Sequence, residues 1–98
     1  MTPPVYIRAE AEQDLDEAAG WYEKQQPGLG QQFLDEVLIA LRSICERPNM
    51  YPSVGRGARR TLIRRFPFGI YYRTEKDGIV VVAVMHGSRS PRRWQGRT

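Results

Sequence analysis

The spacing of apolar residues changes once along this chain, and that change limits the folds it can adopt. From Ala11 to Cys45, apolar residues recur every three or four positions, which is the spacing of helices with one buried face. Pro27-Gly28 interrupts this pattern and Pro48 ends it, so we expect two helices packed as an antiparallel hairpin. Residues 49–57 are rich in Pro and Gly and are predicted to form a loop.

Beyond Thr61, β-branched and aromatic residues replace the helical pattern. Strands are predicted near residues 61–65 and 69–74. A further strand over Ile79–Met85 is apolar on both faces and is therefore expected inside the sheet. A short strand over Val5–Arg8 is expected near a sheet edge.

The predicted fold class is α+β, with the element order β-α-α-β-β-β. The N-terminal helical hairpin covers one face of a small, mostly antiparallel twisted sheet. A chain of 98 residues is expected to form a single domain over residues 1–98, of which 91–98 are a basic tail. Strict alternation along the last strand groups Val80, Val82, Val84 and His86 on one face, and Ile79, Val81, Ala83 and Met85 on the other.

Charge is divided unevenly along the chain. The first 49 residues carry nine acidic and four basic side chains, a net charge of −5, whereas residues 50–98 carry two acidic and eleven basic ones, a net charge of +9. This imbalance exceeds what solubility alone requires, and it suits a polyanion or an acidic protein partner. The arginines responsible are Arg56, Arg59, Arg60, Arg64, Arg65, Arg73, Arg89, Arg92, Arg93 and Arg97.

Several classes of protein do not fit this sequence. Cys45 is the only cysteine, which excludes an intrachain disulfide and a cysteine-rich zinc site. We find no phosphate-binding glycine loop, Ser/His/Asp set or metal-ligand cluster, so neither a cofactor nor a metal is expected. The longest apolar run, Ile79 to Met85, is far short of the roughly 20 residues of a membrane helix. We expect a cytoplasmic protein without a leader or membrane segment.

His86 is the only histidine, and it is predicted at the end of a strand, near Arg89 and close to Arg64 and Arg65. An imidazole beside guanidinium groups could move a proton during phosphodiester cleavage, while the arginines neutralise the phosphorane. His86 could equally cap the strand by hydrogen bonding. A second proton-transfer group is not evident, because the nearby tyrosines are expected to pack and Glu75 and Asp77 occupy a turn. The nuclease set is therefore incomplete.

Aromatic residues offer further contacts. Trp21 lies off the apolar stripe of the first helix, so it is expected either to be exposed for a protein contact or to fold back over the helical turn. Five aromatic residues are interleaved with the arginines and could stack on bases, although most are expected in the core: Phe66, Phe68, Tyr71, Tyr72 and Trp94.

Four stretches, in this order, resemble the RelE/ParE superfamily of type II toxins, and its ParE branch more closely. The similarity extends from about Tyr6 to Trp94. The stretches are Ala11-Glu12-Gln13-Asp14-Leu15 with Ala18 and Trp21-Tyr22; Pro27-Gly28-Leu29-Gly30 before Phe33-Leu34; Arg65-Phe66-Pro67-Phe68-Gly69-Ile70-Tyr71-Tyr72-Arg73; and Val84-Met85-His86-Gly87-Ser88-Arg89-Ser90-Pro91-Arg92-Arg93-Trp94.

The resemblance implies a bacterial toxin that forms a hetero-oligomer with a cognate antitoxin, whose C-terminal segment wraps around it. ParE-type members poison DNA gyrase without nuclease activity, whereas RelE-type members cut mRNA in the ribosome. By position, Arg65, His86 and Arg89 match the motif arginine and the His-x-x-Arg element. The chain departs from the RelE pattern because it has Arg59 and Arg60 in place of a lysine-rich segment, and Trp94 in place of a tyrosine or histidine.

These departures favour gyrase as the target. We expect target contacts from Arg65, Arg89, Arg92, Arg93 and Trp94, and antitoxin contacts from Trp21, Arg59, Arg60, Arg64 and Arg73. The alternative is a metal-free, ribosome-dependent endoribonuclease that uses His86 with Arg65 and Arg89. A third possibility is a relative that is no longer toxic and persists as a partner of the antitoxin or as a repressor subunit.

Overall fold

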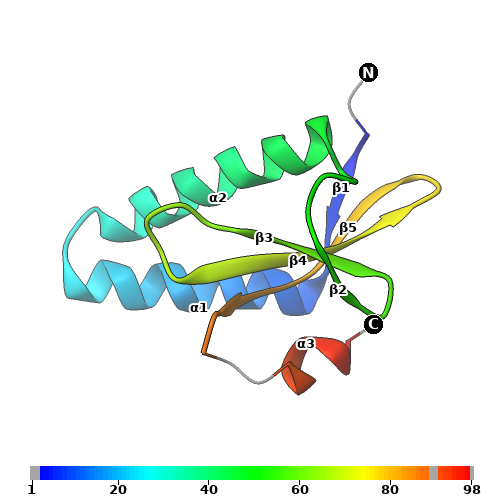
Figure 1. Cartoon of the computed structure of the whole chain (residues 1–98). Helices are drawn as coiled ribbons and strands as arrows, with labels where there is room; N and C mark the ends of the chain where they lie inside the picture. Colours follow the sequence, from blue (N-terminus) through cyan, green and yellow to red (C-terminus); the bar gives the residue numbers. More distant parts are fainter. Residues whose placement is uncertain (1–2, 89–90, 98) are drawn as a thin grey trace.

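The computed structural model of the chain, which describes residues 3–88 and 91–97, has two helices packed on a five-stranded sheet (Figure 1). None of the described helices has both the length and the apolar content needed to cross a bilayer. The elements are β1 (Val5–Ile7), α1 (Ala9–Gln25), α2 (Leu29–Glu46), β2 (Ser53–Gly55), β3 (Ala58–Leu62), β4 (Phe68–Glu75), β5 (Gly78–His86) and α3 (Arg92–Gln95).

The helical hairpin is confirmed, and it turns where Pro27-Gly28 predicted. Gly28 has φ 89°, a left-handed conformation that costs little without a side chain. The Glu23 carboxylate accepts hydrogen bonds from the backbone N–H groups of Gly28 (2.9 Å) and Gly30 (3.1 Å). One side chain of α1 thus satisfies the amides that open α2, where a helix has no internal partners for them.

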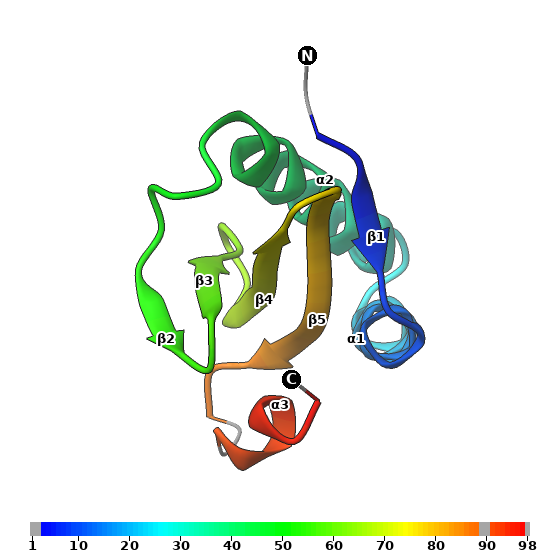
Figure 2. The same ribbon diagram turned by 90° about the vertical axis from the view of Figure 1, so that its right-hand side faces the viewer.

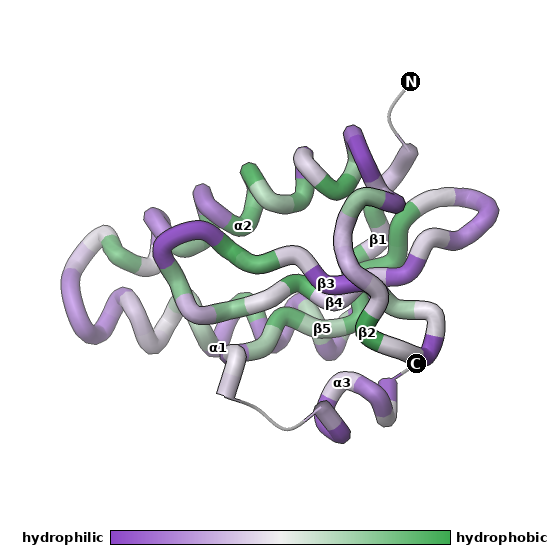
Figure 3. The backbone as a smooth tube through the Cα atoms, viewed as in Figure 1, coloured by the Kyte–Doolittle hydropathy of each residue, from purple (hydrophilic) through white to green (hydrophobic). Residues whose placement is uncertain are grey.

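The sheet has the strand order β1-β5-β4-β3-β2 (Figure 2). Only β1 and β5 are parallel, and the other neighbours are antiparallel. The prediction of a mostly antiparallel sheet is confirmed, with β1 at an edge and β5 between β1 and β4. Figure 3 shows hydrophobic residues gathered along β4 and β5, and hydrophilic ones at the β4–β5 hairpin tip and the interhelical turn.

Two local predictions were wrong. β3 covers 58–62 instead of 61–65, and residues 53–55 of the expected loop form β2. The basic tail contains a short helix, α3, for which no prediction was made. Arg56 and Gly57 both have positive φ, 54° and 72°, as the two central residues of a tight hairpin turn require. The Gly-rich segment is therefore a β-hairpin connection and not an open loop.

The strict alternation predicted for the last strand was also wrong. Tyr71 pairs with Ala83 while Tyr72 pairs with Val81, so Val82 is an extra residue in β5, a β-bulge. Val82 and Ala83 both join the cluster on the α3 side of the sheet, and Ile79, Val81 and Val84 join the cluster beneath the helices. The bulge therefore turns Val84, and His86 two residues later, toward the helical layer.

Candidate functional site

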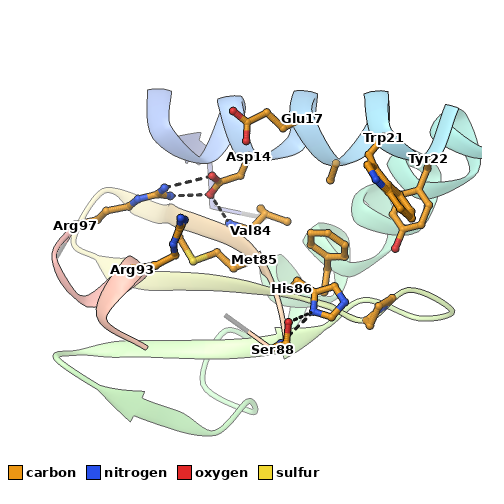
Figure 4. A pocket seen from close by; sticks show the side chains of 13 residues that line it. Asp14, Glu17, Trp21, Tyr22, Val84, Met85, His86, Ser88, Arg93 and Arg97 are labelled. Atoms are coloured by element: carbon orange, nitrogen blue, oxygen red, sulfur yellow. Dashed lines mark hydrogen bonds and ion pairs between the residues drawn. The ribbon is translucent and has the colours of Figure 1, made fainter. Parts of the chain in front are cut away.

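A groove of about 880 Å³ runs between α1 and the C-terminal half of β5 (Figure 4). α1 forms one wall, the end of β5 forms the floor, and α3 with the residues after it closes one end. Its lining residues are Asp14, Glu17, Ala18, Trp21, Tyr22, Pro67, Phe68, Val84, Met85, His86, Ser88, Arg93 and Arg97.

The floor of this groove includes a strand edge that lacks a neighbouring strand. β1 pairs with β5 only as far as Val81, so residues 82–86 have no strand beside them on that side among the described residues. Side chains take the strand's place there. Asp14 Oδ2 accepts a hydrogen bond from the Val84 N–H (3.0 Å), and the Arg97 guanidinium donates to the Val82 carbonyl (3.2 Å).

The same two side chains form an ion pair with each other. Arg97 Nη1 lies 2.6 Å from Asp14 Oδ2, and Arg97 Nη2 lies 3.2 Å from Asp14 Oδ1. The Arg8 guanidinium donates to the Arg97 carbonyl oxygen. The C-terminal segment is thereby held against β5 and α1, at the end of the groove opposite the aromatic residues.

That aromatic end is built on Trp21 and Tyr22 of α1. Trp21 is 58% exposed, which is one of the two alternatives considered from the sequence, and its ring meets Tyr22 edge-on at 5.1 Å. Tyr22 contacts Phe66 (4.8 Å) and Phe33 (5.4 Å) in the core. Burial raises the pKa of the Tyr22 phenol above its ordinary value of 10.0.

His86 lies at the end of β5, as predicted, and lines the groove. Its Nδ1 accepts a hydrogen bond from the Ser88 N–H (3.0 Å), and the Ser88 hydroxyl lies 2.8 Å from the same nitrogen. The ring meets Phe68 edge-on at 5.4 Å. Within the described residues, its hydrogen-bond partners belong to Ser88 alone, which is the strand-capping arrangement considered from the sequence.

Arg65 does not line the groove. It belongs to the loop between β3 and β4, with φ 73°, and its guanidinium binds α2 through Gln32 Oε1 (2.9 Å) and, at 3.7 Å, Glu36 Oε2. Arg65 thus contacts the helical layer, whereas His86 contacts Ser88 and Phe68. The third member of the nuclease set, Arg89, lies outside the described residues.

The other predicted arginines occupy different parts of the molecule. Arg59 donates to the Tyr51 carbonyl (2.6 Å), and Arg73 is 3.2 Å from Glu75. Arg64 is exposed in the β3–β4 loop, and Arg92 and Arg93 belong to α3. The arginines therefore do not form one continuous cluster.

Trp94 is buried, with 3% of its surface exposed, and stacks on Tyr71 at 5.0 Å. A buried ring cannot contact a target while α3 stays in place. Its position instead anchors α3 to the face of the sheet opposite α1 and α2, where it packs in one cluster with Met85 and Ala83.

Sequence reasoning did not select Asp14 or Arg97 as site residues. Asp14 stood among the acidic residues of the first helix, and Arg97 among ten arginines of the basic half. They are 83 positions apart, and no local pattern connects them. Among the described residues, no group of three or more His, Cys, Asp or Glu side chains could hold a metal ion.

Comparison with known proteins was decisive for the family. The family described as ParE toxin of type II toxin-antitoxin system, parDE, matches residues 5–91. The chain belongs to the ParE toxin family. Toxin ParE2 of Mycobacterium tuberculosis, from strain CDC 1551 / Oshkosh and from strain ATCC 25618 / H37Rv, is 30% identical over 95 residues, covering 93% of this chain and 88% of the relative.

A solved structure described as the chromosomal ParDE TA system from P. aeruginosa has the same fold. A chain from it superposes with a TM-score of 0.77 at 18% identity, covering 87% of this chain and 96% of its own length. At this identity the likeness concerns the fold alone. It agrees with the α+β architecture of this ParE family member, in which two helices pack on a mostly antiparallel sheet.

Proposed function

We propose that this chain is a cytoplasmic ParE-type toxin that inhibits DNA gyrase by protein contacts, and that a cognate antitoxin neutralises it by occupying the groove along β5. Membership of the ParE family supports the role of toxin. The similar fold found in a ParDE toxin-antitoxin system supports an antitoxin as the partner.

The observation that supports the antitoxin site best is the edge of β5 over residues 82–86, which has no neighbouring strand among the described residues and is bound there by the side chains of Asp14 and Arg97. An extended peptide can add to such an edge through its backbone, in place of those side-chain contacts, while its side chains enter pockets on either side. At one end of the groove, Trp21 and Phe68 offer a contact for an apolar side chain. At the other end, Arg93 is an exposed cation that suits a carboxylate.

Inhibition by protein contact is favoured over RNA cleavage by the way the nuclease candidates are held. Arg65 is bound to α2, and the Nδ1 of His86 is bound to Ser88. The described residues therefore do not bring Arg65 and His86 together around the groove.

Two assays with the purified chain test the target. In the first, gyrase supercoils relaxed plasmid in the presence of increasing toxin, and in the second a translating extract receives toxin and a labelled message. We expect supercoiling to stop while the message stays intact. Cleavage of the message with normal supercoiling would show that the chain is an endoribonuclease. No effect in either assay would show that it is a relative that is no longer toxic.

Trp21 fluorescence tests the antitoxin site. In a Trp94→Phe variant, Trp21 is the only indole, and burial by the antitoxin should shift its emission to shorter wavelength and protect it from acrylamide. The matched control is Trp21→Phe, which keeps only the buried Trp94 and should show no shift. Binding detected by calorimetry without a change in Trp21 emission would place the antitoxin elsewhere.

A further inference from the structure

The face of the sheet opposite α1 and α2 carries a second exposed surface beside α3. Alternation along β3 places Arg60 and Leu62 on the same face as the buried Ala58, which packs with Trp94. The register with β4 sets Arg60 opposite Tyr71, and Leu62 opposite Gly69. We call these residues, with Arg73 of β4, the outer sheet face: Arg60, Leu62, Gly69 and Arg73.

Arg60 is distinctive because it is half-buried and lacks a polar partner among the described residues. Its Nε, like that of Arg73, is buried without a hydrogen-bond acceptor, but Arg73 has an ion pair with Glu75. The aliphatic part of its side chain lies over Gly69, where an added Cβ would be 3.1 Å from Arg60 Cδ. By contrast, Arg59, Arg65 and Arg97 all bind acceptors within the chain. A half-buried guanidinium with an unsatisfied donor favours an external anion.

The residues around Arg60 indicate what kind of molecule carries the anion. Leu62 is 68% exposed, the largest exposed fraction among the large apolar side chains described. Because Gly69 stands opposite it, no side chain from β4 covers it. The surface thus offers an apolar contact next to a cation, and arginine is enriched among the residues that dominate protein interfaces.

We propose that the outer sheet face binds an acidic segment of the target protein, with a carboxylate on Arg60 and an apolar side chain against Leu62. This inference rests on the proposed function and divides its two partners between two surfaces: the antitoxin occupies the groove on the helical side, and the target contacts the opposite face.

A protein segment fits this surface better than a nucleic acid does. Arg73 is already paired with Glu75 at 3.2 Å, and that carboxylate repels a phosphate backbone. The aromatic rings nearest Arg60 cannot stack on bases, because Tyr71 and Trp94 are buried against each other. One unpaired arginine beside an exposed leucine matches a carboxylate beside an apolar side chain.

The test compares gyrase inhibition with antitoxin affinity for two variants of this face and two controls. Arg60→Glu and Leu62→Asp alter the face, and Leu62 is exposed enough to change without loss of the fold. Arg42→Glu and Ile39→Asp make the same changes at exposed positions on α2. Circular dichroism melting verifies that each variant folds. We expect the toxin concentration for half-inhibition to rise about tenfold or more for both face variants, with antitoxin affinity unchanged and both controls like the wild type.

Several results would overturn the inference. If the face variants lose antitoxin affinity but inhibit gyrase normally, the outer sheet face binds the antitoxin. If neither antitoxin affinity nor gyrase inhibition changes, the face binds neither partner. Reduced binding of labelled DNA or RNA with normal inhibition would indicate a nucleic-acid surface. If the wild type does not inhibit gyrase, the proposed function fails, and growth arrest on expression decides the inference: loss of arrest in Arg60→Glu and Leu62→Asp supports it, and retained arrest rejects it. A wild type that neither inhibits gyrase nor arrests growth would overturn both proposals.

Discussion

Asp14 and Arg97 form the ion pair that joins the C-terminal segment to α1, with Nη1–Oδ2 and Nη2–Oδ1 distances of 2.6 and 3.2 Å. Asp14 also accepts the Val84 N–H, and Arg97 donates to the Val82 carbonyl. Two side chains from opposite ends of the sequence therefore satisfy the strand edge that β1 leaves open. The contact holds closed the end of the groove that the C-terminal segment forms.

Replacing Asp14 is expected to destabilise the fold. Asp14→Asn leaves Arg97 partly buried without its counter-ion, and we expect the free energy of unfolding to fall by about 2–3 kcal/mol. Asp14→Ala should cost more, because the Val84 N–H then also loses its acceptor. Urea denaturation measures both, with the exposed Asp16→Asn on the same helix as the control. Equal stability of Asp14→Asn and Asp16→Asn would show that the ion pair contributes little.

Gly30 sets how closely the two helices approach. A Cβ at this position would lie 2.6 Å from the Ala19 carbonyl oxygen and 3.0 Å from Glu23 Oε1. We expect Gly30→Ala to lower stability by about 2 kcal/mol, because the backbone of α1 must move. The control is Gly20→Ala on α1, where a Cβ meets no atom within 4 Å, and a gain of about 0.5–1 kcal/mol is expected. Thermal or urea denaturation measures the change in stability of both variants. Changes of the same sign in Gly30→Ala and Gly20→Ala would contradict the packing argument.

Local signals were enough to predict the helical hairpin and the central strands. Pro27-Gly28 and Pro48 act on the backbone where they stand, so the ends of both helices could be predicted. The bulge at Val82 could not, because it exists only in the register between β5 and β4. Its effect is large, since it reverses which residues of β5 face the helices. The turn at Arg56-Gly57 was mistaken for a loop because arginine rarely adopts positive φ.

The candidate site could be predicted only for residues whose position in a helix or strand pattern was informative by itself. Trp21 lay off the apolar stripe and is exposed, and His86 lay at a strand end and lines the groove. The partner of each arginine depends on tertiary contacts, which composition does not contain. Charge counting therefore grouped Arg65 with Arg60, although Arg65 is paired with α2 and Arg60 has no partner in the described part of the chain.

Replacing His86 separates the two mechanisms of toxicity. If toxicity depends on protein contacts at the outer sheet face, His86 lies in the groove away from them, and His86→Ala should weaken gyrase inhibition by about 1 kcal/mol or less, at most roughly fivefold. If His86 moves a proton during RNA cleavage, the rate should fall by about 10²–10⁴. The measurement is the dose needed for growth arrest, with Ser88→Ala as a companion that removes the hydroxyl beside Nδ1. Complete loss of arrest in a folded His86→Ala protein would favour the nuclease.

Alkaline pH is expected to destabilise the chain through its buried tyrosines. Tyr72 donates its hydroxyl to the Pro48 carbonyl at 2.6 Å. Burial raises the pKa of Tyr72 above its ordinary value of 10.0; Arg59 acts in the opposite direction, and Tyr51 raises it further. Burial also raises the pKa of Tyr22, and that of Cys45 from 9.0, where Glu46 adds to the effect. The folded chain therefore keeps protons that the unfolded chain has already released.

The sign of the effect follows from this difference. The stability due to these groups is complete below the unfolded pKa values, and it is lost as the pH rises through the raised values of the folded state. Urea midpoints should therefore fall above about pH 9, the lower of the two ordinary values. Tyr72→Phe should lose about 1 kcal/mol at neutral pH with its hydrogen bond to Pro48, yet decline less steeply in alkali. An equally steep decline in Tyr72→Phe would assign the alkaline sensitivity to other groups.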